Sequence, residues 1–164
     1  MKKITLVILS VLIGFTSIAR NNKHKKKQSG NEIISVELNR TGCYGRCPTY
    51  MVEINKDGIA TYTAIRFTTD SIGTYRKKIG KAKAMEILNE INSYQVDTCK
   101  DTYRYVPDLP GLNLTIKYQN KTKSIVNAKN GPSFLLHLGK IIEDAGLKAD
   151  DNGWKKVTAP NDKK

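Results

Sequence analysis

Alternation of apolar and polar residues predicts a β-sheet in the central part of this 164-residue chain. Apolar residues recur at every second position, a period that is typical of strands with one buried face. The strands expected on this basis are 34–38, 50–54, 60–64, 73–79, 112–118 and 124–128. The residues Asn55-Lys56-Asp57-Gly58 separate the second and third runs, and Asp-Gly at such a position predicts a hairpin turn.

Two segments change to helical spacing, with apolar residues three and four positions apart. They are 81–94 and 132–145, and each has a single apolar stripe that predicts packing against one face of the sheet. Pro132 suits a first helical turn, and Gly146 is expected to end the second helix. The order β-β-β-β-α-β-β-α with short loops therefore predicts an α+β domain, an antiparallel sheet with two helices packed on one face.

The N-terminal residues predict export. An apolar run, 4–19, follows two lysines and is short for a membrane span, which needs about 20 residues. Small residues at Ser17 and Ala19 fit a signal peptide, 1–19, that is cleaved after Ala19. Positive charge directly after the run resists translocation, which leaves an uncleaved N-terminal membrane anchor as the alternative. We therefore expect a periplasmic or secreted protein.

The net charge of +13 is concentrated outside the expected domain. Residues 20–30 hold five cationic residues and are expected to form a flexible tether that binds anionic surfaces or an envelope protein weakly. Residues 31–148 have the length of one domain, and 149–164 form a polar tail in which Trp154 either folds back or is exposed. Nucleic acid is not an expected partner of an exported chain.

Two cysteines four positions apart, Cys43 and Cys47, form the most unusual local pattern. Fully extended, their Cα atoms would lie about 13 Å apart, whereas a disulfide needs about 4.4–6.8 Å. Gly42 and Gly45 permit the necessary curl, and Pro48 suits the first position of the next strand. A tight loop between the first two strands is therefore expected.

The pairing of the three cysteines stays open at this point. Closing the five-residue loop contributes about 2 kcal/mol in the chain-entropy model, and a bond from this loop to Cys99 would contribute about 4 kcal/mol. Local geometry and ease of encounter favour Cys43–Cys47. A bond to Cys99 and the absence of any disulfide are the alternatives.

The stretch R-T-G-C-Y-G-R-C-P-T-Y resembles a group of exported bacterial domains known only as a domain of unknown function. Its pattern R-x-x-C-x-G-x-C-P-x-Y falls on Arg40, Cys43, Gly45, Cys47, Pro48 and Tyr50. D-T-Y at 101–103, D-L-P at 108–110 and a helix that begins at Pro132 are similar to the same layout. The resemblance spans 33–142 and implies an exported α+β domain in which Cys99 is the odd thiol. The resemblance does not imply any activity.

The residues favour a non-enzymatic binding or structural module over an enzyme. Neither histidine, His24 or His137, has an evident catalytic partner, and Glu143–Asp144 and Asp150–Asp151 are expected to be solvated. No cofactor is expected. Aromatic and Arg residues are common interface anchors. We therefore expect a contact surface formed by Tyr44, Arg46, Tyr103 and Tyr105, unless these tyrosines cap the core edge.

Two chemical alternatives use the same loop. In the first, Cys43 and Cys47 exchange disulfides, and Arg40 and Arg46 favour the reactive thiolate by their charge. In the second, a Cys₃His set of Cys43, Cys47, Cys99 and His137 binds zinc, or the sulfurs bind Cu(I). The spacing matches neither a C-x-x-C redox motif nor a standard zinc pattern, so both rank below the structural disulfide.

Overall fold

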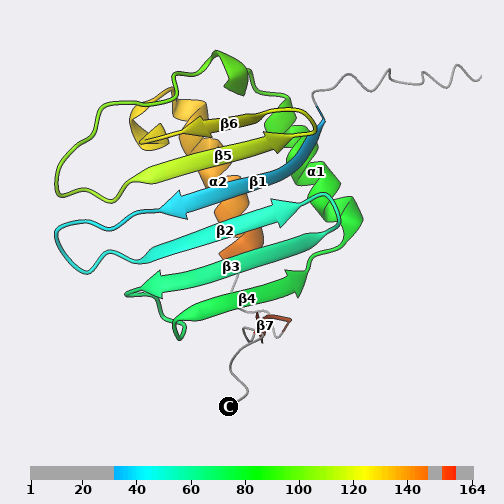
Figure 1. Ribbon diagram of the computed structural model, residues 1–164, viewed down its shortest axis with the longest axis horizontal. Helices are drawn as coiled ribbons and strands as arrows, with labels where there is room; N and C mark the ends of the chain where they lie inside the picture. The colour runs from blue at the N-terminus through cyan, green and yellow to red at the C-terminus, as the bar shows by residue number, and fades with distance from the viewer. Residues whose placement is uncertain (1–31, 148–152, 158–164) are drawn as a thin grey trace, which may run out of the picture.

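A computed structural model describes residues 32–147 and 153–157 (Figure 1). The expected signal peptide, the basic tether and most of the polar tail lie outside the described residues. Those boundaries and the cleavage after Ala19 stay predictions. The described residues include the whole expected contact surface.

The chain forms an antiparallel sheet, as the alternation predicts. Its strands are β1 (Ile33–Arg40), β2 (Thr49–Asn55), β3 (Ile59–Arg66), β4 (Gly73–Lys78), β5 (Leu112–Tyr118), β6 (Thr122–Ile125) and β7 (Lys155–Val157). They lie in the order β6-β5-β1-β2-β3-β4-β7, and every neighbouring pair is antiparallel (Figure 1). The predicted α+β class is confirmed.

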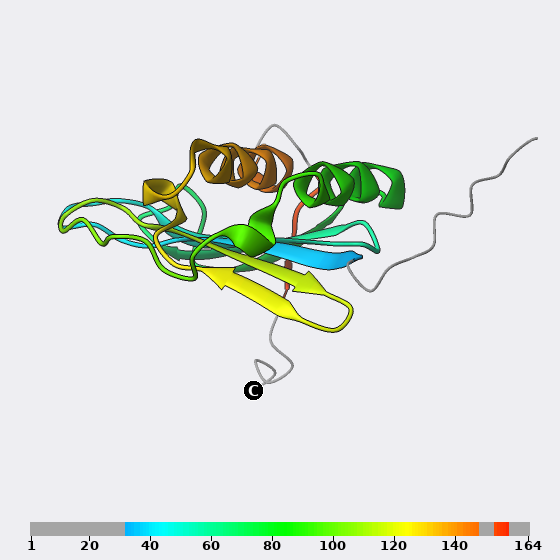
Figure 2. The same cartoon turned by 90° about the horizontal axis from the view of Figure 1, so that it is seen from above.

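Both helices pack on the same face of the sheet (Figure 2). They are α1 (Lys81–Asn92) and α2 (Ser133–Leu147). One 3₁₀ turn, Val96–Thr98, follows α1, and another, Ala128–Asn130, precedes α2. Gly146 lies inside α2 and does not end it. A side chain there would overlap Val52 of β2, so this glycine permits a close approach of helix and sheet. Within the described ranges neither helix has the length and hydrophobicity that crossing a bilayer requires.

The core lies between the helices and one face of the sheet. Its largest fully buried side chains come from β1, β2, β5, β6, α1 and α2, and they include Leu38, Leu114, Leu88 and Leu138. One register prediction is wrong, because Ile33 is buried in place of Ile34. A register irregularity between Ile33 and Ser35, where β1 pairs with β5, shifts the start of the strand by one position.

A seventh strand, which the alternation does not predict, closes the β4 edge. Trp154 packs edge-on against Tyr62, with 6.2 Å between ring centroids, and the three residues of β7 then pair with β4. Trp154 therefore folds back onto the domain. The contact of the Trp154 ring with Tyr62 holds β7 in place. With only three residues, β7 is too short and too polar for its alternation to be recognised in the sequence.

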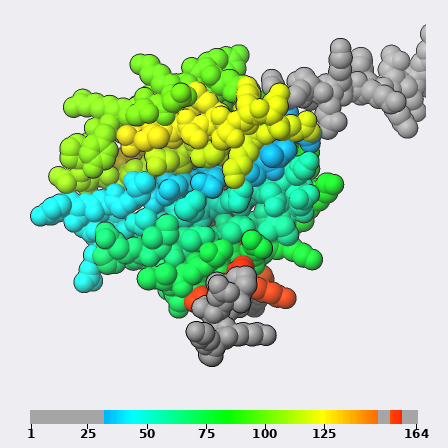
Figure 3. Space-filling model, viewed as in Figure 1, coloured from blue at the N-terminus to red at the C-terminus, as the bar shows by residue number. Residues whose placement is uncertain are grey.

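The opposite face of the sheet is covered by neither helix. The space-filling view looks onto this face and shows the side chains of neighbouring strands exposed (Figure 3). The loops after β1 and β3 and the loop before β5 all lie at one end of the sheet, because Arg40 pairs with Leu112 and Thr49 pairs with Arg66. The candidate site lies at this end.

Candidate functional site

The β1–β2 connection is a disulfide-closed loop, residues 41–48. Cys43 and Cys47 are bonded, with their Cα atoms 5.6 Å apart, so the predicted pairing is confirmed. Cys99 is a buried free thiol, which makes the alternative pairing wrong. The N–H of Gly45 donates to the Cys43 sulfur at 3.3 Å, so the curl is held from within the loop as well.

The base of this loop is tied to helix α2 by a carboxylate. Arg40 at the end of β1 and Tyr50 at the start of β2 are cross-strand neighbours. Arg40 donates from Nε and Nη2 to the two oxygens of Glu143, at 2.6 and 3.0 Å. The Tyr50 hydroxyl donates to Oε1 of the same carboxylate at 2.6 Å. The two outer residues of the motif therefore clamp α2 to the sheet.

Electrostatics reinforce this Arg40–Tyr50–Glu143 clamp. Burial alone raises the pKa of Glu143, but hydrogen bonds from Arg40 and Tyr50 and the charge of Arg40 outweigh burial, so the pKa lies below its ordinary value. The hydrogen bond to Glu143 raises the pKa of Arg40. Burial, followed by the hydrogen bond to Glu143, raises the pKa of Tyr50. At neutral pH the clamp therefore joins a carboxylate, a guanidinium and a phenol.

Glu143 is a site residue that the sequence pattern alone does not single out. It was expected to be solvated beside Asp144, yet its side chain is mostly buried, while Asp144 is exposed. A signal for it exists in the helical spacing. Glu143 lies four positions after the buried Gly139 and three before the buried Gly146, so it falls on the inward stripe of α2.

A second loop lies beside the disulfide loop, and the two project together beyond the sheet (Figures 1 and 2). This second loop, residues 99–111, precedes β5. Two hydrogen bonds between Thr41 and Gly111 join the bases of the two loops. The Gly111 N–H donates to Thr41 Oγ1 at 3.0 Å, and the Thr41 N–H donates to the Gly111 carbonyl at 3.2 Å. Residues 41–48 and 99–111 are called the paired loops below.

The longer of the paired loops is held by polar side chains from the segment before α2. Asn127 donates to the Tyr103 carbonyl at 3.2 Å, and Asn130 donates to the Arg104 carbonyl at 2.9 Å. Asp108 has a positive φ of 64°, a conformation that Asp tolerates better than most residues, and it reverses the chain before Pro110. The D-L-P sequence therefore shapes the return of this loop to β5.

The structure brings three of the four expected contact residues to the surface. Tyr44 is 91% exposed and Tyr105 65% exposed, and Arg46 is exposed as well. Tyr103 differs, since it packs against the core and its ring lies so close to Gly131 that a Cβ there would be only 2.7 Å from it. For Tyr103 the alternative is correct, and it caps the core edge.

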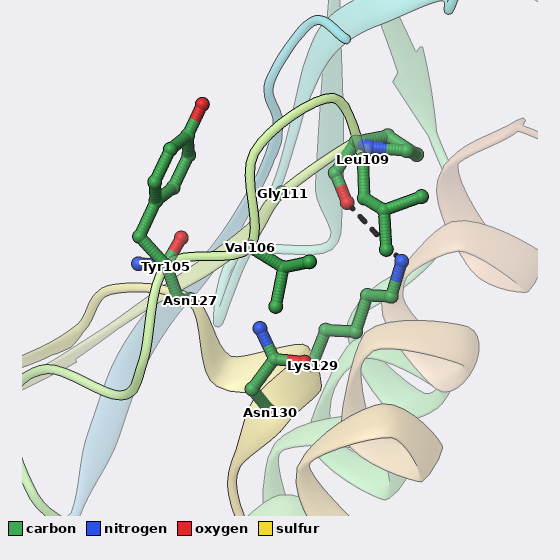
Figure 4. Close-up of a pocket in the computed structure, with 8 residues that line it drawn as sticks. Tyr105, Val106, Leu109, Gly111, Asn127, Lys129 and Asn130 are labelled. Carbon is green, nitrogen blue, oxygen red and sulfur yellow. Dashed lines mark hydrogen bonds between the residues drawn. The ribbon is translucent and has the colours of Figure 1, made fainter.

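A small recess lies behind the longer of the paired loops. It is lined by Tyr105, Val106, Leu109, Pro110, Gly111, Asn127, Lys129 and Asn130 (Figure 4). Its volume is about 10 Å³, and Lys129 reaches across it to the Pro110 carbonyl at 3.5 Å. Such a volume holds about one water molecule. This recess therefore has no room for a small-molecule ligand, and the surface to consider is the outer one.

The Cys₃His metal set is not assembled. Cys43 and Cys47 are bonded to each other, Cys99 is buried, and His137 on α2 lies 3.4 Å from Glu90 on α1. Across residues 32–147 and 153–157, no three His, Cys, Asp or Glu side chains are grouped as a metal site would require. Binding of a soft metal would first need reduction of the disulfide.

Comparison with protein families places this sequence within one of them. Residues 34–146 match the family model described as a domain of unknown function, DUF6438. The match covers both strands of the motif, the paired loops and all of α2 up to Gly146. A search of curated proteins finds no match to the chain.

Proposed function

We propose that this chain, which belongs to the DUF6438 family of unknown function, is an exported, non-enzymatic binding module of the bacterial envelope. Its contact surface is formed by the paired loops, with Tyr44, Arg46 and Tyr105 as the anchors. The observation that carries this proposal is the exposure of Tyr44, 91%, at the tip of a loop held by a disulfide and a clamp.

Rigidity of the loop supports a binding role. A ring held in water gains nothing from burial in the folded protein, so its exposure needs another explanation. Binding costs less when the contact residues are already fixed in position. The disulfide and the Thr41–Gly111 hydrogen bonds hold the backbone on either side of Tyr44, and aromatic and Arg residues dominate the energetics of interfaces.

The disulfide also supports export. Disulfides persist in oxidising compartments and are rare in the cytosol. The bond adds to the signal-like residues 1–19, which lie outside the described part of the chain. An exported domain with a projecting, preorganised loop is suited to contact another component of the envelope.

Thiol exchange is the alternative function of the same loop, because both cysteines are only partly buried and Arg46 lies beside Cys47. The reduction potential separates the two functions. A structural bond is expected below about −300 mV, and a working exchange site near −180 mV. A measured value near the second figure would replace the binding proposal with a redox one.

Site-specific photo-crosslinking in intact cells tests the proposal. A photoreactive residue at position 44 or 105 should form adducts with an envelope component, whether protein, polymer or lipid. The same residue at position 136, where Leu136 is exposed on α2, is the matched control. Adducts at 44 and 105 that weaken in an Arg46→Ala background support the paired loops. Equal labelling at 44 and 136, or none at 44, would show that the proposal is wrong.

A further inference from the structure

Exposed apolar side chains gather at one end of the sheet. Among the described residues, nine large hydrophobic side chains are exposed, and six of them lie at the end of the sheet that carries the paired loops: five in three loops, and Ile65 in β3 directly before one of these loops. These six are Tyr44, Ile65, Phe67, Ile72, Tyr105 and Leu109. Residues 41–48, 65–72 and 99–111 are called the loop rim below. Such a concentration on a small domain indicates an interaction surface.

Each of the three loops also joins an exposed aromatic ring to an exposed arginine. Tyr44 is followed by Arg46, Tyr105 is preceded by Arg104, and Phe67 is preceded by Arg66. The Arg66 guanidinium lies 4.6 Å from the centre of the Phe67 ring. The same pair of an aromatic ring and an arginine therefore recurs three times. The planar guanidinium of arginine can bind two phosphate oxygens at once.

The β3–β4 loop presents its apolar groups under backbone constraint. Phe67 has a φ of 54°, which is rare for a bulky residue, and its side chain is still 47% exposed. Ile72 in the same loop is 71% exposed. Neither side chain is in the buried core. A left-handed Phe that keeps its ring in water indicates that the loop is shaped for an outside contact.

The shape of the loop rim favours a fluid surface over a protein partner. Its apolar groups come from three separate chain segments, and the recess beside Tyr105 holds about 10 Å³. A protein partner would have to match three projections with concave surfaces, whereas a lipid interface admits separate side chains independently. Tyr rings and Arg side chains also suit the headgroup level of a bilayer, where one part is apolar and the other hydrated.

We propose that the loop rim docks on the surface of an anionic phospholipid bilayer. Tyr44, Phe67 and Tyr105 enter the interface, and Arg46, Arg66 and Arg104 bind the phosphate groups. This inference rests on the proposed function, because it names the envelope component that the paired loops contact. Lys100 and three carboxylates, Asp70, Asp101 and Asp108, are also exposed in the rim, so the rim is only mildly cationic and binding is weak and reversible.

Depth-dependent quenching with pure lipid vesicles tests the inference. The protein is purified as the producing cell processes it, so that every variant carries the same N-terminal segment. Vesicles contain phosphatidylcholine and phosphatidylglycerol with brominated acyl chains. A Tyr44→Trp variant should lose fluorescence on binding, whereas a Leu136→Trp variant on α2 should not. Trp154 packs on Tyr62 and contributes the same background to both.

Arginine variants test the phosphate contacts. Each replacement among Arg46→Gln, Arg66→Gln and Arg104→Gln should weaken binding about fivefold on anionic vesicles. Arg76→Gln, at an exposed position of β4 outside the rim, is the matched control and should leave binding unchanged. Denaturation curves of all four variants confirm that the fold is intact.

The results separate this inference from the proposed function. Equal quenching at positions 44 and 136, or equal effects of Arg46→Gln and Arg76→Gln, would overturn the lipid assignment. If vesicles fail to quench Trp at position 44 while crosslinking there still yields protein adducts, the partner is a protein and the binding function stands. If both experiments fail, both proposals are wrong.

Discussion

The base and the tip of the disulfide loop are a few residues apart in sequence, but their side chains lie in opposite environments. At the base, Arg40 and Tyr50 are half-buried and share the Glu143 carboxylate with α2. At the tip, Tyr44 and Arg46 extend into solvent. The pattern R-x-x-C-x-G-x-C-P-x-Y names the base and the bridge and leaves positions 44 and 46 open.

The motif therefore combines positions with two different roles. Its named positions account for geometry, since they clamp the helix, close the loop and, at Pro48, lead directly into β2. Two of its unnamed positions, 44 and 46, carry the exposed side chains of the proposed contact surface. Changes at the base should therefore alter stability, and changes at the tip should alter binding alone.

The largest effect is expected at the clamp. Glu143→Ala leaves the half-buried Arg40 and Tyr50 without their shared acceptor, so the free energy of unfolding should fall by about 2–3 kcal/mol in urea denaturation. Asp144→Ala changes the exposed neighbour and should stay within about 0.5 kcal/mol of the wild type. Equal losses in the two variants would contradict the clamp.

Removing the bridge should have the next largest effect. The double change Cys43→Ser/Cys47→Ser frees a five-residue loop and should cost about 2 kcal/mol of unfolding free energy. A reducing agent should lower the stability of the wild type by a similar amount and leave the double variant unchanged, because Cys99 is unpaired and buried. A further loss in the reduced double variant would mean that Cys99 takes part in a bond.

Two glycines provide a matched comparison of base and tip. A Cβ on Gly111 would overlap the Thr41 hydroxyl that joins the paired loops, so Gly111→Ala should cost about 1–2 kcal/mol. The nearest atom to a Cβ on Gly45 is the Cys43 sulfur at 3.9 Å, so Gly45→Ala should change the unfolding free energy by less than about 0.5 kcal/mol. Thermal denaturation of both variants measures the difference, and a reversed order would show that the loop bases are not joined as described.

Acid should reduce the contribution of the clamp to the free energy of unfolding. The pKa of Glu143 is lower in the folded protein than in the unfolded chain, where it is about 4.3. The carboxylate therefore stabilises the fold above that pH, and this contribution is lost as the pH falls through the folded value. The stability gap between the wild type and Glu143→Gln should narrow below about pH 4. A gap that is constant with pH would mean that Glu143 is not charged in the clamp.

The smallest effect on stability is expected at the tip. Tyr44→Ala removes a side chain that is 91% exposed, so its unfolding free energy should stay within about 0.5 kcal/mol of the wild type. Docking on vesicles should nevertheless weaken, as centrifugation with sedimented vesicles would measure. A large loss of stability in Tyr44→Ala would place the ring in the fold and remove the contrast with the base.

Periodicity was sufficient to predict the body of the fold. The strands around Leu38, Ile54 and Leu114 and the stripe of α2 around Leu138 have one buried face each, and burial is the quantity that periodicity reports. The Cys43–Cys47 bond was predictable because a chain that curls brings two cysteines four positions apart within reach of each other. The curl does not use the freedom expected of Gly42 and Gly45, since neither has a positive φ and a Cβ on either would make only ordinary contacts. The start of β1 was placed one residue off, since an irregularity shifts the phase without changing the composition.

The clamp and the loop rim could not be predicted in the same way. The role of Glu143 is hard to predict for two reasons. Its position on the inward stripe of α2 indicates burial, whereas its charge indicates exposure. Its partner Arg40 is also 103 residues away in the sequence. Phe67 and Ile72 are apolar, so sequence patterns favour burying them, whereas the turn between β3 and β4 places them in solvent. Strand β7 depends on the contact of Trp154 with Tyr62, which no local pattern contains.

The interior position of β1 in the sheet has a consequence for how the chain folds. This strand is made first, yet one of its two neighbours is β5, and the Thr41–Gly111 contact joins residues 70 positions apart. A chain emerging from the N-terminal end cannot complete its sheet until β5 has also emerged. Non-local pairing of this kind slows folding. The topology itself thus delays compaction and keeps the early polypeptide open, a property that would suit the export proposed for this chain.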